Sequence, residues 1–408
     1  MAKLEVEQEA GAPSQSPPSA ELVIGLPGLV DVGHLRSIAG QWSGSGRPIA
    51  VVHPSVPGMN DALESLGDSA NVRLVAREIP AGAISTVPWL GSPAVYSALL
   101  AEAESLGARA CVILNPDLAA FTSDSVDALV RPLLGDSCDL AMPIYRARPL
   151  DALLNQAILA PVTRALYGKR VRYPLAQDFA VSAGLLPMLR QGISMPAAGQ
   201  GLVWPATEAV LRDKKVCQVH LPVHHEYAMA GIDLPALLQF IVAPLFADME
   251  WHASVWQRIR TSHSTTVSGT ESPTAEEADT SRDARPMVEA FQLGQRNLQE
   301  LWSLVLPPVT LLELKKLSRQ PLESFRMPDA LWARVVYDFA LAYRLRTLGR
   351  GHLLGAMAPL YLGWVASRVL EVQDGVASGP RQEQLERTFE VNKPYLVQRW
   401  RWPDRFNP

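Results

Sequence analysis

Two short stretches of the chain place metal-ligand side chains directly after apolar, strand-like runs. Asp117 follows the run in "VILNPD", and His220, His224 and His225 fall in "VHLPVHHEY". Open α/β sheets place their ligands at the carboxyl ends of strands. Mg²⁺ and Mn²⁺ take carboxylates, phosphate oxygens and, for manganese, an imidazole. One Asp, one His and a ligand diphosphate therefore form a sensible metal set; a turn-forming Asp and solvated loop histidines are the alternatives.

A basic run and a buried-looking carboxylate lie between these two stretches. "RALYGKRVRYP" holds Arg164, Lys169, Arg170 and Arg172. Guanidinium groups match carboxylates and phosphates, so the run indicates an anion site, although a solvated basic turn at a helix end fits equally well. Asp178 follows among apolar neighbours in "PLAQDFAVSAG". A carboxylate in such surroundings needs a partner, so Asp178 belongs either to a structural ion pair or to an active-site acid.

The first part of the chain alternates between strand and helix patterns. We expect strands at 21–26, 49–53, 72–76, 110–115 and 138–145, with helices at 30–42, 58–66, 92–107 and 124–134. Gly107 is expected just past the end of one helix, and Thr122 to Asp124 at the start of the next. Short β-branched runs between helices predict βαβ units and a mostly parallel α/β sheet. The glycine spacing after the first strand does not match the dinucleotide fingerprint.

The rest of the chain is predominantly helical. After a helix at 149–167, another near 205–213 and a strand at 215–221, helices are expected at 233–260, 286–305, 308–318, 327–347, 351–373 and 381–399. Two polar segments, 1–20 and 261–285, carry few apolar residues and are predicted to be a disordered tail and a disordered insertion. We therefore expect an α/β domain over 21–230 and a helical domain over 231–408. The helical half would also suit a homodimer interface, but such helices pack on their own chain just as readily.

Composition limits the class of protein. Hydrophobic residues make up 48% and charged residues 19%, and the net charge is −4. These values suit large buried cores and argue against a general nucleic-acid binder. The three cysteines are far apart and lie in apolar runs, so we expect small core residues rather than a disulfide or zinc site. The apolar stretch at 232–251 is short for a membrane span and is interrupted by prolines. A cytoplasmic protein without a membrane partner is expected.

These stretches, in this order, carry a resemblance to a known family. "LDALLNQAILAPVTRALYGKRVRYPLAQDFAVSAG" resembles a segment of the cytosolic GT-A-fold glycosyltransferases that make glucosylglycerate, mannosylglycerate and glucosyl-3-phosphoglycerate. "LGARACVILNPDL", "KVCQVHLPVHHEY" and "DLPALLQFIVAPLFADMEWHASVWQRI" are also similar. The likeness covers nearly the whole chain except the N-terminal tail and 261–285, and its most specific part is "TRALYGKRVR". It implies a GT-A sheet followed by an all-α region.

The resemblance also implies an activity and site residues. A hexose would pass, with retention, from a GDP-, UDP- or ADP-sugar to glycerate, phosphoglycerate or a similar anion. Asp117 would take the last place of an Asp-Xaa-Asp motif and, with His225 of the His225–Glu226 pair, hold Mg²⁺ or Mn²⁺. Asp178 would be the catalytic carboxylate. The donor side would include Pro27, Gly91, Asn115 and Asp117, and the acceptor side Arg146, Asn155, Thr163, Lys169, Arg170 and Arg172.

Several positions depart from the family pattern. Asn115 stands where the first carboxylate of Asp-Xaa-Asp is usual, and "GSP" at 91–93 replaces a Gly-Lys-Gly loop. Charge-assisted contacts are worth about 1.5–3 kcal/mol each, so two losses would weaken donor binding on the order of 10²–10⁴-fold. The alternative is therefore a catalytically impaired relative that acts as a binding or regulatory protein.

Overall fold

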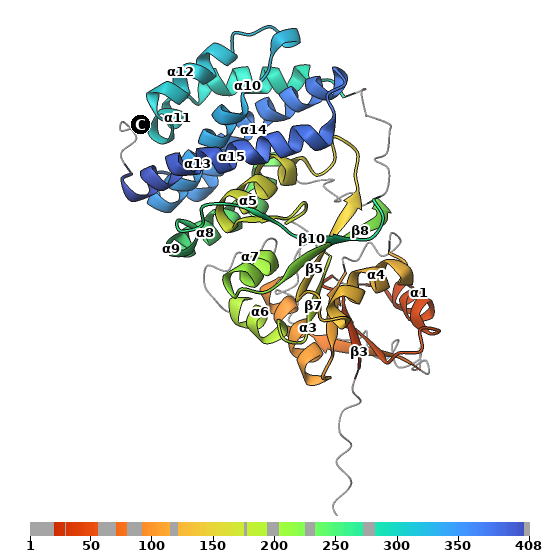
Figure 1. Ribbon diagram of the computed structural model, residues 1–408. Helices are drawn as coiled ribbons and strands as arrows, with labels where there is room; N and C mark the ends of the chain where they lie inside the picture. The colour runs from red at the N-terminus through yellow and green to blue at the C-terminus, as the bar shows by residue number, and fades with distance from the viewer. Residues whose placement is uncertain are drawn as a thin grey trace, which may run out of the picture.

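The structure is a computed structural model, and it describes residues 20–28, 30–55, 71–79, 92–114, 121–174, 178–193, 204–224, 233–271 and 282–403. The chain forms an α/β part built on a sheet and a helical part stacked on one end of it (Figure 1). This α/β class, with a mostly parallel sheet and a helical C-terminal region, confirms the coarse expectation from the sequence.

Within the described residues, eight strands form one sheet in the order β10-β8-β5-β7-β4-β1-β2-β3. All neighbouring pairs are parallel except those of β7, which runs antiparallel to both β4 and β5. The inner strands are apolar and buried on both faces, as in sheets covered by helices. The strands are β1 (Leu22–Gly25), β2 (Ile49–Ser55), β3 (Val72–Glu78), β4 (Ala110–Ile113), β5 (Leu140–Arg146), β7 (Phe179–Ser182), β8 (Val216–His224) and β10 (Thr266–Ser268).

Local signals explain where the helices of the α/β part begin and end. Asp31, Ser92 and Thr122 each accept a hydrogen bond from the backbone three residues ahead, which caps the helix N-terminus. Gly107 has φ +65° after the helix that ends at Ser105, as expected for a left-handed C-terminal residue. The helices are α1 (Val32–Trp42), α3 (Pro93–Ser105), α4 (Ser123–Leu134), α6 (Leu186–Ile193) and α7 (Trp204–Leu211).

The helical part includes a segment from the middle of the chain as well as the C-terminal helices. Its hydrophobic core takes in residues 150–167 together with the helices after 233, whereas the sheet strands share a second core. The two cores therefore do not divide at residue 230. The elements are η3 (Asn155–Leu159), α5 (Ala160–Tyr167), α8 (Leu234–Trp251), α9 (Ala253–Trp256), α10 (Arg285–Asn297), α11 (Gln299–Val305), α12 (Pro308–Leu317), η4 (Leu322–Ser324), α13 (Asp329–Leu345), α14 (Arg350–Gln373) and α15 (Ser378–Arg401).

The prediction of disorder over 261–285 was wrong for 261–271. His263–Ser264 form β9, which pairs with β6 (Lys169–Arg170), and β10 extends the main sheet beside β8. The polar composition concealed these strands, because an edge strand keeps one side in water and needs few apolar residues. Gly269 follows β10 at φ +85°, where an added Cβ would lie 2.8 Å from the His220 carbonyl oxygen.

The expectation of three unpaired cysteines was also wrong. All three are buried, but Cys138 and Cys217 form a disulfide, and Cys111 is free. Cys138 precedes β5 and Cys217 lies on β8, so the pairing of these neighbouring strands brings their Cα atoms to 6.0 Å. The two residues are 79 positions apart in the chain, so a search for closely spaced cysteines could not identify the pair.

Two helices, α8 and α14, are long and apolar enough to cross a membrane. The apolar window of α14 is 78% buried inside the protein, as is typical of a central core helix. The corresponding window of α8 is 44% buried. Among the described helices, α8 is therefore the apolar one with a large outward-facing surface.

Candidate functional site

Strand direction brings most of the expected site residues to one edge of the sheet. The parallel strands β1, β4, β5 and β8 end there, and the antiparallel β7 begins there. Arg146 at the end of β5 is in register with His224 at the end of β8. Asp178 directly precedes Phe179, which pairs with Ile113 at the end of β4. Pro27 is buried just beyond β1 at the same edge.

A pocket of about 270 Å³ opens beside this edge, and we call it the edge pocket. It is lined by Ile144, Tyr145, Arg146, Ala147, Arg172, Tyr173, His220, Val267 and Glu271. A smaller hollow, the helix pocket, adjoins it through Ala147, Arg172 and Tyr173 and reaches the first turns of α15 at Ser378 and Gln382. Its remaining lining residues are Arg148, Pro149, Asn155 and Gln156. Both structural parts of the chain therefore contribute to the site.

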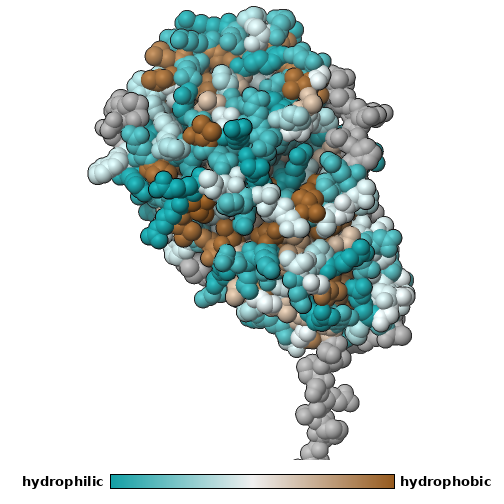
Figure 2. All heavy atoms as spheres, viewed as in Figure 1, coloured by the Kyte–Doolittle hydropathy of each residue, from teal (hydrophilic) through white to brown (hydrophobic). Residues whose placement is uncertain are grey.

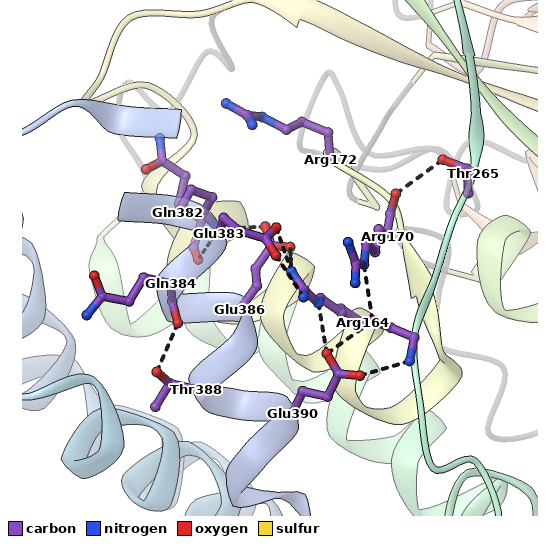
Figure 3. Close-up of polar contacts among 12 residues, drawn as sticks. Arg164, Arg170, Arg172, Thr265, Gln382, Glu383, Gln384, Glu386, Thr388 and Glu390 are labelled. Carbon is purple, nitrogen blue, oxygen red and sulfur yellow. Dashed lines mark hydrogen bonds and ion pairs between the residues drawn. The ribbon is translucent and has the colours of Figure 1, made fainter. Parts of the chain in front are cut away.

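The two pockets are rich in guanidinium groups. Arg146, Arg148 and Arg172 line them, against the carboxylate of Glu271. Arg148 is held by Asp151, with 3.5 Å between Nε and Oδ1. Figure 3 shows the Arg172 side chain directed away from the glutamates of α15. Forked donors of this kind suit carboxylate or phosphate groups, so the chemistry of the pockets favours a small anion.

Asp178 lies behind the edge pocket rather than in its lining. The residue is fully buried, and its Oδ2 accepts a 2.6 Å hydrogen bond from the Tyr145 hydroxyl. The Tyr145 ring packs edge-on against Tyr173, with 5.3 Å between centroids. This arrangement supplies the partner that a buried carboxylate requires. Because Tyr145 also lines the edge pocket, it links Asp178 to that pocket.

Asn155 connects the π-helical turn η3 to the basic segment. The side chain is 2% exposed, and its Nδ2 donates to the Arg172 carbonyl oxygen at 2.8 Å. This bond holds the backbone that presents Arg172. The Asn155 Oδ1 is buried and has no hydrogen-bond partner among the described residues. Because Asn155 lines the helix pocket, this unused acceptor lies within the pocket wall, beneath the accessible surface.

The other expected acceptor residues lie elsewhere. Thr163 is 3% exposed within α5. Lys169 and Arg170 form β6, and Arg170 Nε donates to Ser262 Oγ at 3.2 Å. None of the three lines either pocket. The structure therefore brings together Arg146, Asn155 and Arg172 from that set and separates them from the remaining three.

Arg164, which the sequence left open as an anion ligand or a solvated turn residue, is neither. Only 2% of it is exposed, and it contacts Glu383 (2.7 and 2.9 Å), Glu386 (3.4 Å) and Glu390 (3.1 Å) (Figure 3). The hydrogen bond from Arg164 lowers the pKa of Glu383, whereas burial raises the pKa of Glu386. Arg164 thus joins α5 to α15 and fixes the helix whose start lines the pocket.

The expected metal and donor residues Asp117, His225, Asn115 and Gly91 lie outside the described residues, as does Glu226. The described chain stops just before two of these segments, at Leu114 and at His224. Within the part of the chain that the structure describes, no group of three or more His, Cys, Asp or Glu side chains is placed to hold a metal ion. The described donor side contains His53 and Ser55 at the end of β2, both fully buried.

Sequence reasoning missed several residues of the pockets. Tyr145 and Arg148 lie within two residues of Arg146, an expected site residue at the end of β5. Their position near a strand end could therefore have marked them as pocket residues. Gln382 and Glu271 come from distant segments, one of them the segment expected to be disordered, and nothing local marks them. No family model matches the chain, and no curated protein matches it.

Proposed function

We propose that the chain is a GT-A-type, metal-dependent, retaining glycosyltransferase that moves a hexose from a nucleotide-sugar to glycerate, phosphoglycerate or a similar small anion. The observation that carries the proposal is the arginine-lined pair of pockets at the carboxyl edge of a mostly parallel sheet. This edge is where α/β sheets place ligands. The resemblance of the segment around Arg172 supplies the reaction class.

The acceptor is assigned to the edge pocket and the helix pocket. Arg146 and Arg172 supply charge for a carboxylate or phosphate, and the Asn155 Oδ1 supplies an acceptor for a hydroxyl group. A hydroxy acid presents both features on three carbons. Together the pockets would thus recognise both ends of such a molecule, and Tyr145 is part of the edge-pocket wall.

The donor is assigned to the neighbouring end of β4, on the side of Asp178. A divalent cation held by Asp117 and His225 would neutralise the charge of the departing diphosphate. Asp178 and Tyr145 would position the sugar and acceptor hydroxyls. Because Tyr145 donates to Asp178 and lines the edge pocket, it keeps the carboxylate oriented at the wall of that pocket.

Calorimetry with UDP-, GDP- and ADP-hexoses in the presence of Mn²⁺ tests the proposal, followed by transfer assays with glycerate and 3-phosphoglycerate. We expect one nucleotide-sugar to bind only with the metal. Arg172→Gln should raise the KM for the acceptor about 10-fold or more, the value of one lost charge-assisted contact. Arg170→Gln is the matched control, because Arg170 lies two residues away and outside the pockets; it should change the KM little.

Absence of binding by every donor, together with absence of a thermal shift, would refute the enzyme proposal. If the acceptor still binds and Arg172→Gln abolishes that binding, the impaired, binding-only relative becomes the better description. Equal effects of the Arg170 and Arg172 substitutions would contradict the assignment of the acceptor to these pockets.

A further inference from the structure

Helix α8 carries an apolar stripe on its outer side. Phe240 is 41% and Trp251 47% exposed, and the half-buried Ala243, Pro244 and Ala247 lie between them at spacings of three or four residues. A helix of a soluble protein normally turns polar residues outward. Figure 2 shows apolar, brown atoms over the region where Figure 1 places α8. The stripe is therefore suited to an apolar partner outside the chain.

Other exposed apolar side chains gather near the Trp251 end of α8. Trp402 after α15 is 72% exposed and Leu345 at the end of α13 is 44% exposed. Contacts tie these ends together: Arg344 Nη1 donates to the Trp400 carbonyl oxygen at 2.6 Å, and the Trp256 and Trp400 rings lie 5.2 Å apart. Figure 1 shows the dark blue end of α15 on the same side of the molecule as α9.

The same end of the molecule is strongly basic. Arg258, Arg260, Arg346, Arg350 and Arg401 are all exposed there. Across the segments 250–260, 344–350 and 399–403 the sequence has one carboxylate, Glu250, which pairs with Arg350 at 3.6 Å. The chain as a whole has a net charge of −4, so this concentration of positive charge is local. We call these arginines, with Trp251, Leu345, Trp402 and the α8 stripe, the basic-aromatic end.

We propose that the basic-aromatic end docks the protein on an anionic lipid surface. Tryptophan side chains favour the boundary between lipid headgroups and acyl chains, and nearby arginines are attracted to anionic headgroups. Helix α8 would lie in the plane of the interface, because its opposite face is committed to the protein core through residues such as Ile241 and Phe246. The association is therefore peripheral and not a membrane span.

A second copy of the chain and a nucleic acid are less suitable partners for this end. A second copy docked by the same face would bring the five arginines of each chain toward one another across a twofold axis. A nucleic acid would satisfy the arginines, but it offers little to the exposed Phe240 or to the half-buried Pro244 of the stripe. An anionic bilayer satisfies both features at once.

Docking at this end leaves the pockets accessible. Helix α15 begins at the helix pocket with Ser378 and ends at the basic-aromatic end with Arg401. Its 24 residues span about 36 Å at 1.5 Å per residue. Substitutions at the basic-aromatic end should therefore change lipid binding without changing the pockets.

Sedimentation of the full chain with lipid vesicles tests the proposal. We expect binding to an equal mixture of phosphatidylcholine and phosphatidylglycerol, weakening as salt is added, and little binding to phosphatidylcholine alone. The triple variant Arg258→Gln, Arg260→Gln, Arg346→Gln should bind about 100-fold more weakly, because each basic residue near an anionic surface contributes about five-fold.

Two controls keep the result specific. The triple variant Arg36→Gln, Arg73→Gln, Arg319→Gln removes the same charge from exposed positions elsewhere and should bind like the unmodified chain. Trp402→Ser should weaken vesicle binding, whereas Val391→Ser, at a 69% exposed site within the preceding helix α15, should not.

Three results would overturn the proposal: no binding to anionic vesicles at low salt, equal losses in the two triple variants, or binding governed by the same arginines to duplex DNA but not to vesicles. Dimerisation that Trp402→Ser abolishes, without vesicle binding, would instead assign the face to a second copy. None of these outcomes depends on the transfer reaction, so this proposal and the proposed function can fail separately.

Discussion

Replacing Arg164 with methionine tests the contact that joins α5 to α15. The guanidinium is 2% exposed, and its partners differ in exposure: the Glu386 side chain is 10% exposed, that of Glu390 21% and that of Glu383 54%. Removing one member of a buried ion pair costs about 3–5 kcal/mol, because the remaining charge stays desolvated. The exposed Glu383 contributes little, about 0–1 kcal/mol. We therefore expect a loss at the lower end, about 3 kcal/mol.

Thermal and urea unfolding measure this loss. For units of 150–250 residues about 2–4 °C correspond to 1 kcal/mol, so the midpoint for Arg164→Met should fall by roughly 6–12 °C. Adding Glu386→Leu should recover much of the stability, because an apolar pair then replaces the buried carboxylate that has lost Arg164. Arg170→Met, which loses one exposed contact to Ser262, is the matched control. A loss below about 1 kcal/mol, or no recovery in the double variant, would refute the buried-ion reasoning.

Three further predictions concern Asp248, Tyr145 and Gly269. Burial raises the pKa of Asp248 from its usual value of 3.8 to about 7, so the folded state holds a proton that the unfolded state releases. The free energy of unfolding should therefore fall as the pH rises from about 4 to 7. Asp248→Asn should flatten this fall in urea titrations at several pH values, and an unchanged slope would contradict it. Tyr145→Phe removes the hydroxyl donor to Asp178 Oδ2 and should cost about 1–3 kcal/mol in chemical denaturation; a neutral result would mean that another group replaces the hydroxyl. Gly269→Ala should destabilise the protein by about 1–3 kcal/mol, because the new Cβ meets the His220 carbonyl oxygen at φ +85°; an unchanged melting temperature would show that the turn can relax.

The sequence determined the local structure of this protein to a large extent. Alternation of strand and helix periods predicted β1, β2, β3, β4 and β5 with the intervening helices α1, α3 and α4. Thr122 and Gly107 marked helix ends through side-chain capping and left-handed geometry, which depend on a few adjacent residues. The burial of Asp178 also followed from its immediate neighbours.

Tertiary structure alone decided how these elements meet. Arg164 looked like part of a basic run until α15, 219 residues later, brought Glu383 to it. The Cys138–Cys217 disulfide and the Tyr145–Asp178 hydrogen bond depend on strand neighbours. The polar strand β10 depends on the edge offered by β8. Periodicity and capping report interactions over one or two turns, whereas ion pairs, pockets and strand order depend on residues that only the folded chain brings together.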